Sequence, residues 1–157
     1  MTTPAPIAST ELVAQAWIRG VPGLTASGVG SQLPAAEKEW AAGGYIVVPV
    51  TVGGTPMDSG PVNRPVVQVE CWATVLNSDK LPWRVAANLA DQVRVATYDR
   101  TGASQRPLQL GAGYPTCWVR TIKPMTHPRR IWSDEGDYAG YQMDLYLMWI
   151  SAGENLP

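Results

Sequence analysis

Residues 64–75 (RPVVQVECWATV) and residues 81–98 (LPWRVAANLADQVRVATY) decide the fold, because they indicate a strand followed by an amphipathic helix. Along the strand every second side chain is small and apolar, so we expect that face to lie on helices. The opposite face, called here the polar sheet face, should meet solvent or the lumen of a ring. Its polar and amphipathic members are Gln68, Glu70, Trp72 and Thr74. In the helix, Pro82 suits the first turn, and the apolar stripe consists of Val85, Leu89, Val93 and Ala96, with Ala86 and Ala90 widening it.

The other predicted elements are shorter. A helix that begins at Ser9 or Thr10 has apolar residues at helical spacing and ends at Gly20. Residues 21–44 are mostly loop, with a helical turn near residues 34–40. Residues 45–52 (YIVVPVTV) form a strand in which Pro49 favours an edge position. A short extended piece follows at residues 108–113, and two strands at residues 116–125 and 140–150 are joined by a polar connection, which predicts a projecting hairpin.

The order of these elements predicts an α+β fold in one domain, residues 1–157, with a flexible lead (1–8) and a flexible tail (152–157). Strands linked by loops favour antiparallel pairing. We therefore expect two layers, a mainly antiparallel sheet of about four strands with two helices on one face, and a projecting C-terminal hairpin. Cys71 and Cys117 fall on apolar strand faces, which indicates free buried thiols, and the sequence leaves open whether they lie near each other.

The chain is nearly neutral and weakly charged. Lys and Arg number 12 and Asp and Glu number 13, which argues against binding of nucleic acid through a broad positively charged surface. Only 16% of residues are charged, which suits either a subunit covered by its neighbours or a monomer with a neutral polar surface. The N-terminus lacks the basic and apolar regions of a signal peptide, and no segment is apolar enough to span a membrane, so we expect an intracellular origin.

No motif indicates catalysis, a cofactor or a metal site, and we predict that the chain is not an enzyme. His127 is the only histidine, so a nucleophile paired with histidine would have to use it. The acidic residues of 134–137 lack the spacing of a calcium loop and indicate a solvated turn. A modest basic patch beside two tryptophans could contact nucleic acid, but the adjacent acidic run counts against it. The patch consists of Arg120, Lys123, Arg129 and Arg130, with Trp118 and Trp132 nearby.

The order of charges in the polar connection favours a subunit interface. Two arginines precede Trp132, and acidic residues follow it. A segment that is positive on one arm and negative on the other can pair with copies of itself around a ring, although it is also typical of a solvated loop. The candidate interface residues are Arg129, Arg130, Trp132, Asp134, Glu135 and Asp137.

Three stretches carry a resemblance to a known family: residues 11–20 (ELVAQAWIRG), residues 64–73 and 81–93 (RPVVQVECWA and LPWRVAANLADQV), and residues 141–150 (YQMDLYLMWI). In them the chain is similar to the tail terminator (tail completion, head–tail joining) proteins of long, non-contractile-tailed phages of actinobacterial hosts. The resemblance implies a small α+β subunit that assembles into a homo-oligomeric ring, commonly a hexamer. Such a ring caps the tail tube and provides a surface for head–tail joining. The resemblance implies no catalysis and no cofactor, and it transfers no contact residue.

The implied partners are other copies of the chain, the tail tube protein and the head–tail connector or stopper protein. The implied location is the tail or neck region of the virion, after synthesis in the host cytoplasm. Neither a membrane nor a specific nucleic-acid sequence is expected as a partner, beyond passive contact with DNA in the lumen. Three alternatives stay open: a head-completion or connector (neck) protein of the same phage type, a small ligand-binding or enzyme domain with a site under the loop of residues 21–44, and a nucleic-acid-binding module.

Overall fold

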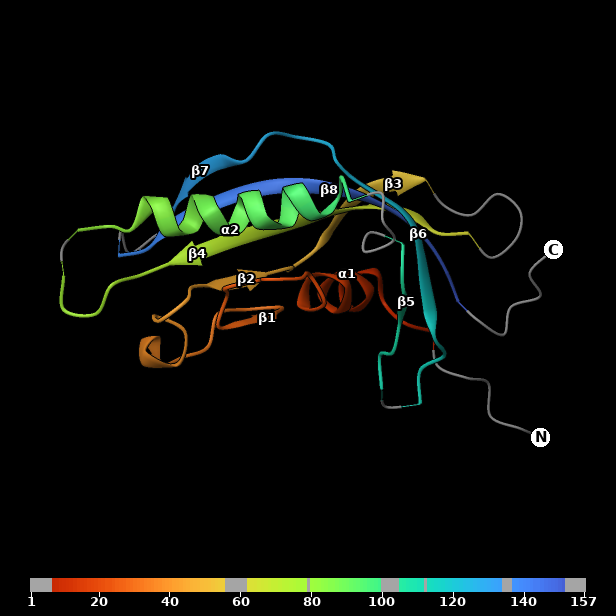
Figure 1. Cartoon of the computed structure of the whole chain (residues 1–157), viewed down its shortest axis with the longest axis horizontal. Coiled ribbons are helices and arrows are strands. Elements are labelled where there is room, and N and C mark those ends of the chain that lie inside the picture. The colour runs from red at the N-terminus through yellow and green to blue at the C-terminus, as the bar shows by residue number, and fades with distance from the viewer. Residues whose placement is uncertain are drawn as a thin grey trace.

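The structure, a computed structural model, describes residues 7–55, 62–78, 80–99, 105–111, 113–133 and 137–151. Over these ranges the chain forms two α-helices, one short 3₁₀ helix and eight strands (Figure 1). The helices are α1 (Thr10–Arg19), η1 (Glu37–Glu39) and α2 (Trp83–Ala96). The strands are β1 (Gly28–Gly30), β2 (Tyr45–Val47), β3 (Thr51–Thr55), β4 (Arg64–Ala73), β5 (Pro107–Leu108), β6 (Cys117–Pro124), β7 (Arg129–Trp132) and β8 (Ala139–Ser151). The predicted lead and tail lie outside the described residues, apart from Ile7 and Ala8.

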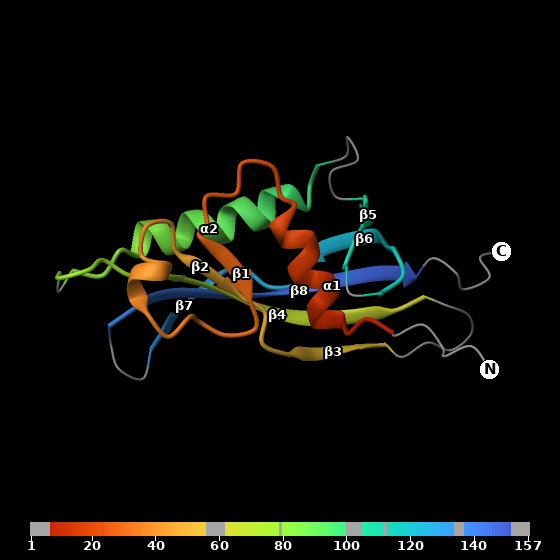
Figure 2. The ribbon, with the colours of Figure 1, turned by 90° about the horizontal axis from the view of Figure 1, so that it is seen from below.

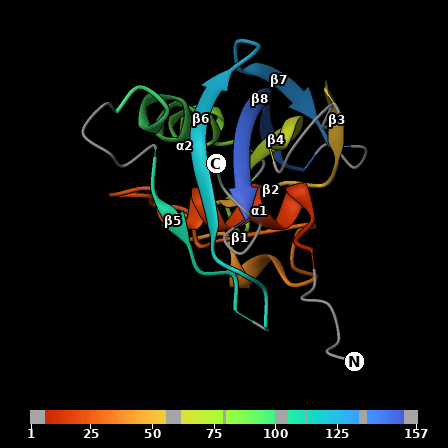
Figure 3. The ribbon, with the colours of Figure 1, turned by 90° about the vertical axis from the view of Figure 1, so that its right-hand side faces the viewer.

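All of these strands belong to one mixed, strongly curled sheet, whose curl is visible along the long axis in Figure 3. The strand order is β1-β2-β4-β8-β6-β5, while β3 pairs with β4 and β7 pairs with β8. The β1–β2 pair is parallel and the other pairs are antiparallel. The α+β class is confirmed, but the two-layer antiparallel sheet of about four strands is wrong. The predicted strand at 45–52 is divided at Pro49 into β2 and β3, and β1, β5 and β7 are too short to show an apolar alternation.

The last strand, β8, lies at the centre of the sheet rather than in a projecting hairpin. On one side β4 pairs with it from Ala139 to Tyr146. On the other side β6 and β7 pair with it in turn, both antiparallel. The break between them is bridged by Met125, whose N–H donates to the Asp144 carbonyl over 2.8 Å. Strands β6 and β8 therefore pair as predicted, but the polar connection between them contains a further strand, β7. The sequence does not predict this edge strand, because its exposed arginines are also typical of a loop.

Both helices bury their apolar sides in the same core as one face of β4 and β8. Figure 2 shows α1 crossing these strands while α2 runs along them. Ser9 caps α1 by accepting the Leu12 N–H over 3.2 Å, and Gly20 follows its last turn, as the sequence predicts. In α2 the buried stripe is Ala86, Leu89, Ala90 and Val93. These four residues all belong to the predicted stripe, but Val85 is exposed, so the buried stripe is rotated away from Val85 towards the two alanines.

The two cysteines are free and fully buried, which confirms the prediction for both thiols. Cys71 pairs across the sheet with Tyr141 of β8, whereas Cys117 pairs with Ser151. Ten positions along a strand correspond to roughly 33 Å, which is far beyond the reach of a disulfide. Burial, aided by the neighbouring Glu70 carboxylate, raises the pKa of the Cys71 thiol well above its ordinary value.

Candidate functional site

Strand β7 carries an exposed pair of aromatic and cationic side chains, called here the hairpin surface and consisting of Arg130 and Trp132 with their supports Trp83 and Tyr141. The other predicted arginine, Arg129, is exposed but pairs with Gln142, so it lies on the opposite side of the strand, on the polar sheet face. The side chain of Trp132 is 65% exposed, although its ring makes an edge contact with Trp83, with centroids 4.8 Å apart. The Arg130 guanidinium lies 4.8 Å from the centroid of the Trp83 ring, and its Nε donates to the Tyr141 hydroxyl over 3.2 Å. The first residue of α2 thus supports both the exposed indole and the arginine.

This arrangement is suited to contact with a macromolecule. Trp, Tyr and Arg are the residues most enriched at the energetic centres of protein interfaces. The Arg130 guanidinium, held over a ring and by a hydrogen bond, loses less side-chain entropy on binding than a free arginine would. The exposed indole of Trp132 has apolar area to bury.

The acidic half of the predicted interface is only partly located. Asp134 and Glu135 lie outside the described residues. Asp137 is exposed, and its N–H donates to the Ser133 hydroxyl over 3.1 Å. The next residue, Tyr138, packs edge-on against Trp40 at 5.1 Å and donates its hydroxyl to Glu37 over 2.9 Å. Through Trp83 on one side and Trp40 on the other, the hairpin is packed against the body, so the predicted projection is wrong.

Three of the four residues predicted for the polar sheet face, Gln68, Glu70 and Trp72, lie on β4 and are joined by hydrogen bonds. Gln68 and Trp72 both donate to the Glu70 carboxylate, over 2.6 Å and 3.0 Å respectively. The pairing of β4 with β8 places Gln142 opposite Glu70 and Asp144 opposite Gln68, which extends the polar row. All four of the residues at these two pairs are half-buried. The face is therefore an ordered polar surface, to which neither α1 nor α2 contributes a core contact.

Two residues of this face depart from the prediction. Thr74 lies beyond the end of β4 and is buried, because the strand stops at Ala73 and the alternation stops with it. Trp72 is almost fully buried and packs with Trp40 and Val47. Trp40 comes from the segment of residues 21–44, which therefore covers one end of the face. A single tryptophan in a Gly-rich loop gives no periodic signal, so sequence reasoning missed this cover.

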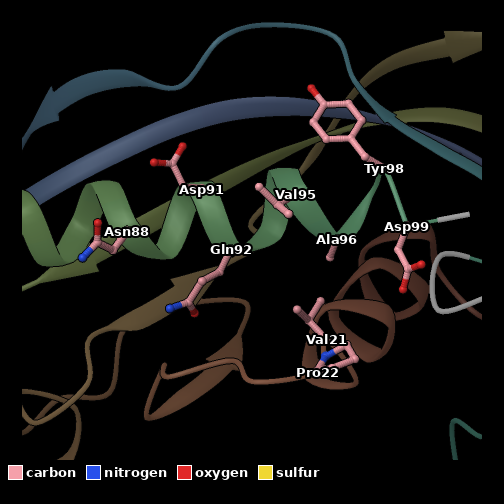
Figure 4. Close-up of a pocket in the computed structure, with 9 residues that line it drawn as sticks. All are labelled: Val21, Pro22, Asn88, Asp91, Gln92, Val95, Ala96, Tyr98 and Asp99. Atoms are coloured by element: carbon pink, nitrogen blue, oxygen red, sulfur yellow. The ribbon is translucent and has the colours of Figure 1, made fainter. Parts of the chain in front are cut away.

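A groove of about 720 Å³ lies between the second half of α2 and the chain just after α1, and it is called here the α2 groove (Figure 4). Val21 and Pro22 form one wall. The other side is formed by the solvent face of α2, where Val95 is 59% exposed, and by Tyr98, which is 57% exposed. Two carboxylates, Asp91 and Asp99, also line the groove. Sequence reasoning missed this site, although apolar residues on the wet side of a helix are a signal for it.

The space under the loop of residues 21–44 holds a second cavity of about 530 Å³. Arg19 lines it, and its guanidinium donates to the Val29 carbonyl over 2.8 Å, which ties the loop to α1. The remaining lining is mostly small or apolar and includes Tyr45. The lining residues include no pair of a nucleophile and a base.

His127 is exposed and lines a small cavity with Arg94, Tyr98 and Met125. Both cysteines are fully buried, so no exposed thiol lies beside it. Among the described residues, no three or more His, Cys, Asp or Glu side chains gather as a metal site would require. None of the described helices has the length and apolar character needed to cross a membrane.

One carboxylate has a structural role. Glu11 of α1 accepts hydrogen bonds from the N–H and the hydroxyl of Thr51 in β3, both over 2.9 Å. Burial acts to raise the pKa of the Glu11 carboxyl, but hydrogen bonds from its own backbone and from Thr51 outweigh this, so the pKa lies below its ordinary value. The charged form of Glu11 therefore stabilises the contact between α1 and the sheet edge.

No protein-family model and no curated protein matches the chain. The functional assignment therefore depends on the chemistry of its own surfaces and on the resemblance described above.

Proposed function

We propose that this chain is a virion structural protein, a ring-forming tail terminator that caps the tail tube and provides the surface for head–tail joining. The hairpin surface is the observation that carries the proposal. A tryptophan that is 65% exposed, held by a second tryptophan that also supports Arg130, is the composition expected of an anchor for a protein partner. The resemblance of three stretches of the sequence to tail terminators supplies the type of partner.

The composition of the polar sheet face supports a ring through which DNA passes without tight binding. Helices α1 and α2 pack on the other face of the sheet, so the part of this face that residues 21–44 leave uncovered can line a lumen. Its carboxylates, Glu70 and Asp144, are balanced by two exposed cations on the same face, Arg129 opposite Gln142 and Lys123 opposite Tyr146. The side chains of Gln68 and Gln142 offer neutral amides. A lumen of this composition favours passive contact with DNA over tight binding.

The proposed partners are further copies of the chain, the tail tube protein and the head–tail connector or stopper protein. A head-completion or connector protein of the same phage type would use similar surfaces. The two roles differ in what the ring binds, because a terminator joins the end of a tail tube, whereas a connector joins the portal side of the neck.

The test is the native mass of the purified chain, measured by light scattering after size exclusion over a wide range of concentration, followed by electron microscopy with assembled tail tubes. We expect a discrete ring of subunits and a cap at one end of each tube. Tubes incubated without the chain are the control. A chain that stays monomeric at high concentration and does not bind tubes would contradict the proposal, and rings that bind portal assemblies but not tubes would favour the connector role.

A further inference from the structure

We propose that the α2 groove of one copy receives the hairpin surface of a second copy, with Trp132 as the inserted side chain. The inference rests on the proposed function, because it names the surface that meets the hairpin surface around the ring. The sequence predicts only the hairpin surface. The proposal adds the site that receives it, which is formed by Val21, Pro22, Val95 and Tyr98.

The groove and the indole match in size and apolar character. At about 720 Å³ the groove has room for an indole and the Arg130 guanidinium beside it. An aromatic side chain of this kind buries about 150–250 Å² when it docks. The groove presents Val95 and Tyr98, each more than half exposed, and such apolar area in a concave site gains free energy when a second apolar surface covers it.

The charges of the two surfaces are complementary. The hairpin surface carries the Arg130 guanidinium beside Trp132, and the groove carries Asp91 and Asp99. Asp91 forms an exposed ion pair with Arg94 over 3.0 Å on its own helix. A carboxylate has about four acceptor positions, so Asp91 can accept a further guanidinium from a neighbouring copy.

The positions of the two surfaces make the contact head-to-tail. The hairpin surface adjoins Trp83, the first residue of α2, whereas the groove extends to Asp99, beyond the last turn. Figure 1 shows β7 on one side of α2, and α1 and β1 on the other. Two different patches on one chain form a heterologous contact, which propagates from copy to copy instead of stopping at a pair and gives a ring when the rotation between copies closes.

The first test is a cross-link between two single-cysteine additions, Trp132→Cys and Val95→Cys. Both positions are exposed, and the native thiols are buried, so background reaction is low. We expect a disulfide-linked dimer when the two variants are mixed under mild oxidation and no dimer from either variant alone. A chain that carries both substitutions should give a ladder of linked oligomers.

The second test measures assembly without a cross-link. Trp132→Ala and Val95→Arg should each raise the concentration needed for half-assembly by about tenfold or more, as loss of an interface anchor does. The matched control is Val52→Arg, because Val52 is 47% exposed on β3, and Figure 3 shows β3 and α2 on opposite sides of the molecule. Far-UV circular dichroism checks that each variant is folded.

The outcomes separate the two proposals. A ring that assembles normally with Val95→Arg and gives no mixed cross-link overturns the groove assignment and leaves the ring intact. A chain that is monomeric at every concentration and gives no cross-link overturns both. If Trp132→Ala leaves the native mass unchanged but abolishes binding of a single-stranded oligonucleotide, the hairpin surface is a nucleic-acid-binding surface, and the groove assignment is wrong.

Discussion

Replacing Gly140 with alanine should destabilise the protein by crowding the contact between β8 and Trp72. Gly140 lies opposite Trp72 of β4 and Ile131 of β7. A Cβ at this position would lie 2.6 Å from Trp72 Cζ3 and 2.8 Å from Ile131 Cγ1. The Trp72 ring would have to move, and its movement would lengthen the 3.0 Å hydrogen bond from Trp72 Nε1 to Glu70.

The size of the effect follows from these two contributions. Overpacking of a buried site costs about 1–3 kcal/mol. Weakening a hydrogen bond to a charged group costs up to about 1.5–3 kcal/mol, and less here because Glu70 is only half-buried. We therefore expect the free energy of unfolding to fall by about 2–4 kcal/mol. The corresponding decrease in Tm is roughly 2–4 °C for each kcal/mol in a chain of this size.

The assay is urea unfolding followed by far-UV circular dichroism, with the slope of the free energy against urea used to check that the unfolding transition is unchanged. Gly53→Ala is the matched control, since a Cβ at Gly53 in β3 would have no atom within 4 Å. It should leave stability within about 0.5 kcal/mol. If Gly140→Ala unfolded at the same urea concentration as Gly53→Ala, the close packing of Trp72 on Gly140 would be wrong.

Three further predictions concern a carboxylate, the core and the thiols. Glu11→Gln should lower the free energy of unfolding by about 1 kcal/mol at neutral pH. Because the folded protein lowers the pKa of the Glu11 carboxyl, this stabilisation is present above the unfolded pKa of about 4.3 and is lost as the pH falls through the folded value, so urea titrations of wild type and variant should converge in acid. Leu89→Ala, at a fully buried position, should cost about 2–5 kcal/mol in urea unfolding. Val85→Ala, in the same helix but exposed, should change stability by about 0.5 kcal/mol or less, and equal losses would contradict the observed rotation of the buried stripe. Neither Cys71 nor Cys117 should react with a thiol reagent in the folded protein, and both should react in denaturant; a thiol that reacts quickly in the native state would refute its burial.

The strands that the sequence predicts correctly are those with long alternation. In β4 and β8, apolar and polar side chains alternate over ten residues or more, and each strand has one buried face. The short strands have no such pattern. In β7, the side chains of Arg129 and Arg130 are exposed, so only its pairing with β8 distinguishes this strand from a loop. The curl of the sheet likewise depends on which short strands pair, which alternation does not encode.

A candidate surface can be predicted from the sequence when its residues lie in one segment, but not when the fold brings them together from distant segments. The order of charges around Trp132 is contained within one segment, so the hairpin surface can be found in the sequence. Its supports cannot, because Trp83 lies almost fifty residues earlier. The α2 groove joins Val21 and Pro22 to residues some seventy positions later, and Trp40 covers the polar sheet face from a loop without periodicity.

The central position of β8 has a consequence for how the chain folds. Ala73 pairs with Ala139 and Val66 with Tyr146, so the middle of the sheet forms only when segments 66 to 80 positions apart meet. Closing a loop of that length costs roughly 4 kcal/mol of chain entropy before any contact compensates for it. Domains dominated by such non-local pairings fold in milliseconds to seconds. Until β8 arrives, β4 has an unpaired edge and an uncovered apolar face, so lower temperature and slower synthesis should raise the yield of soluble protein.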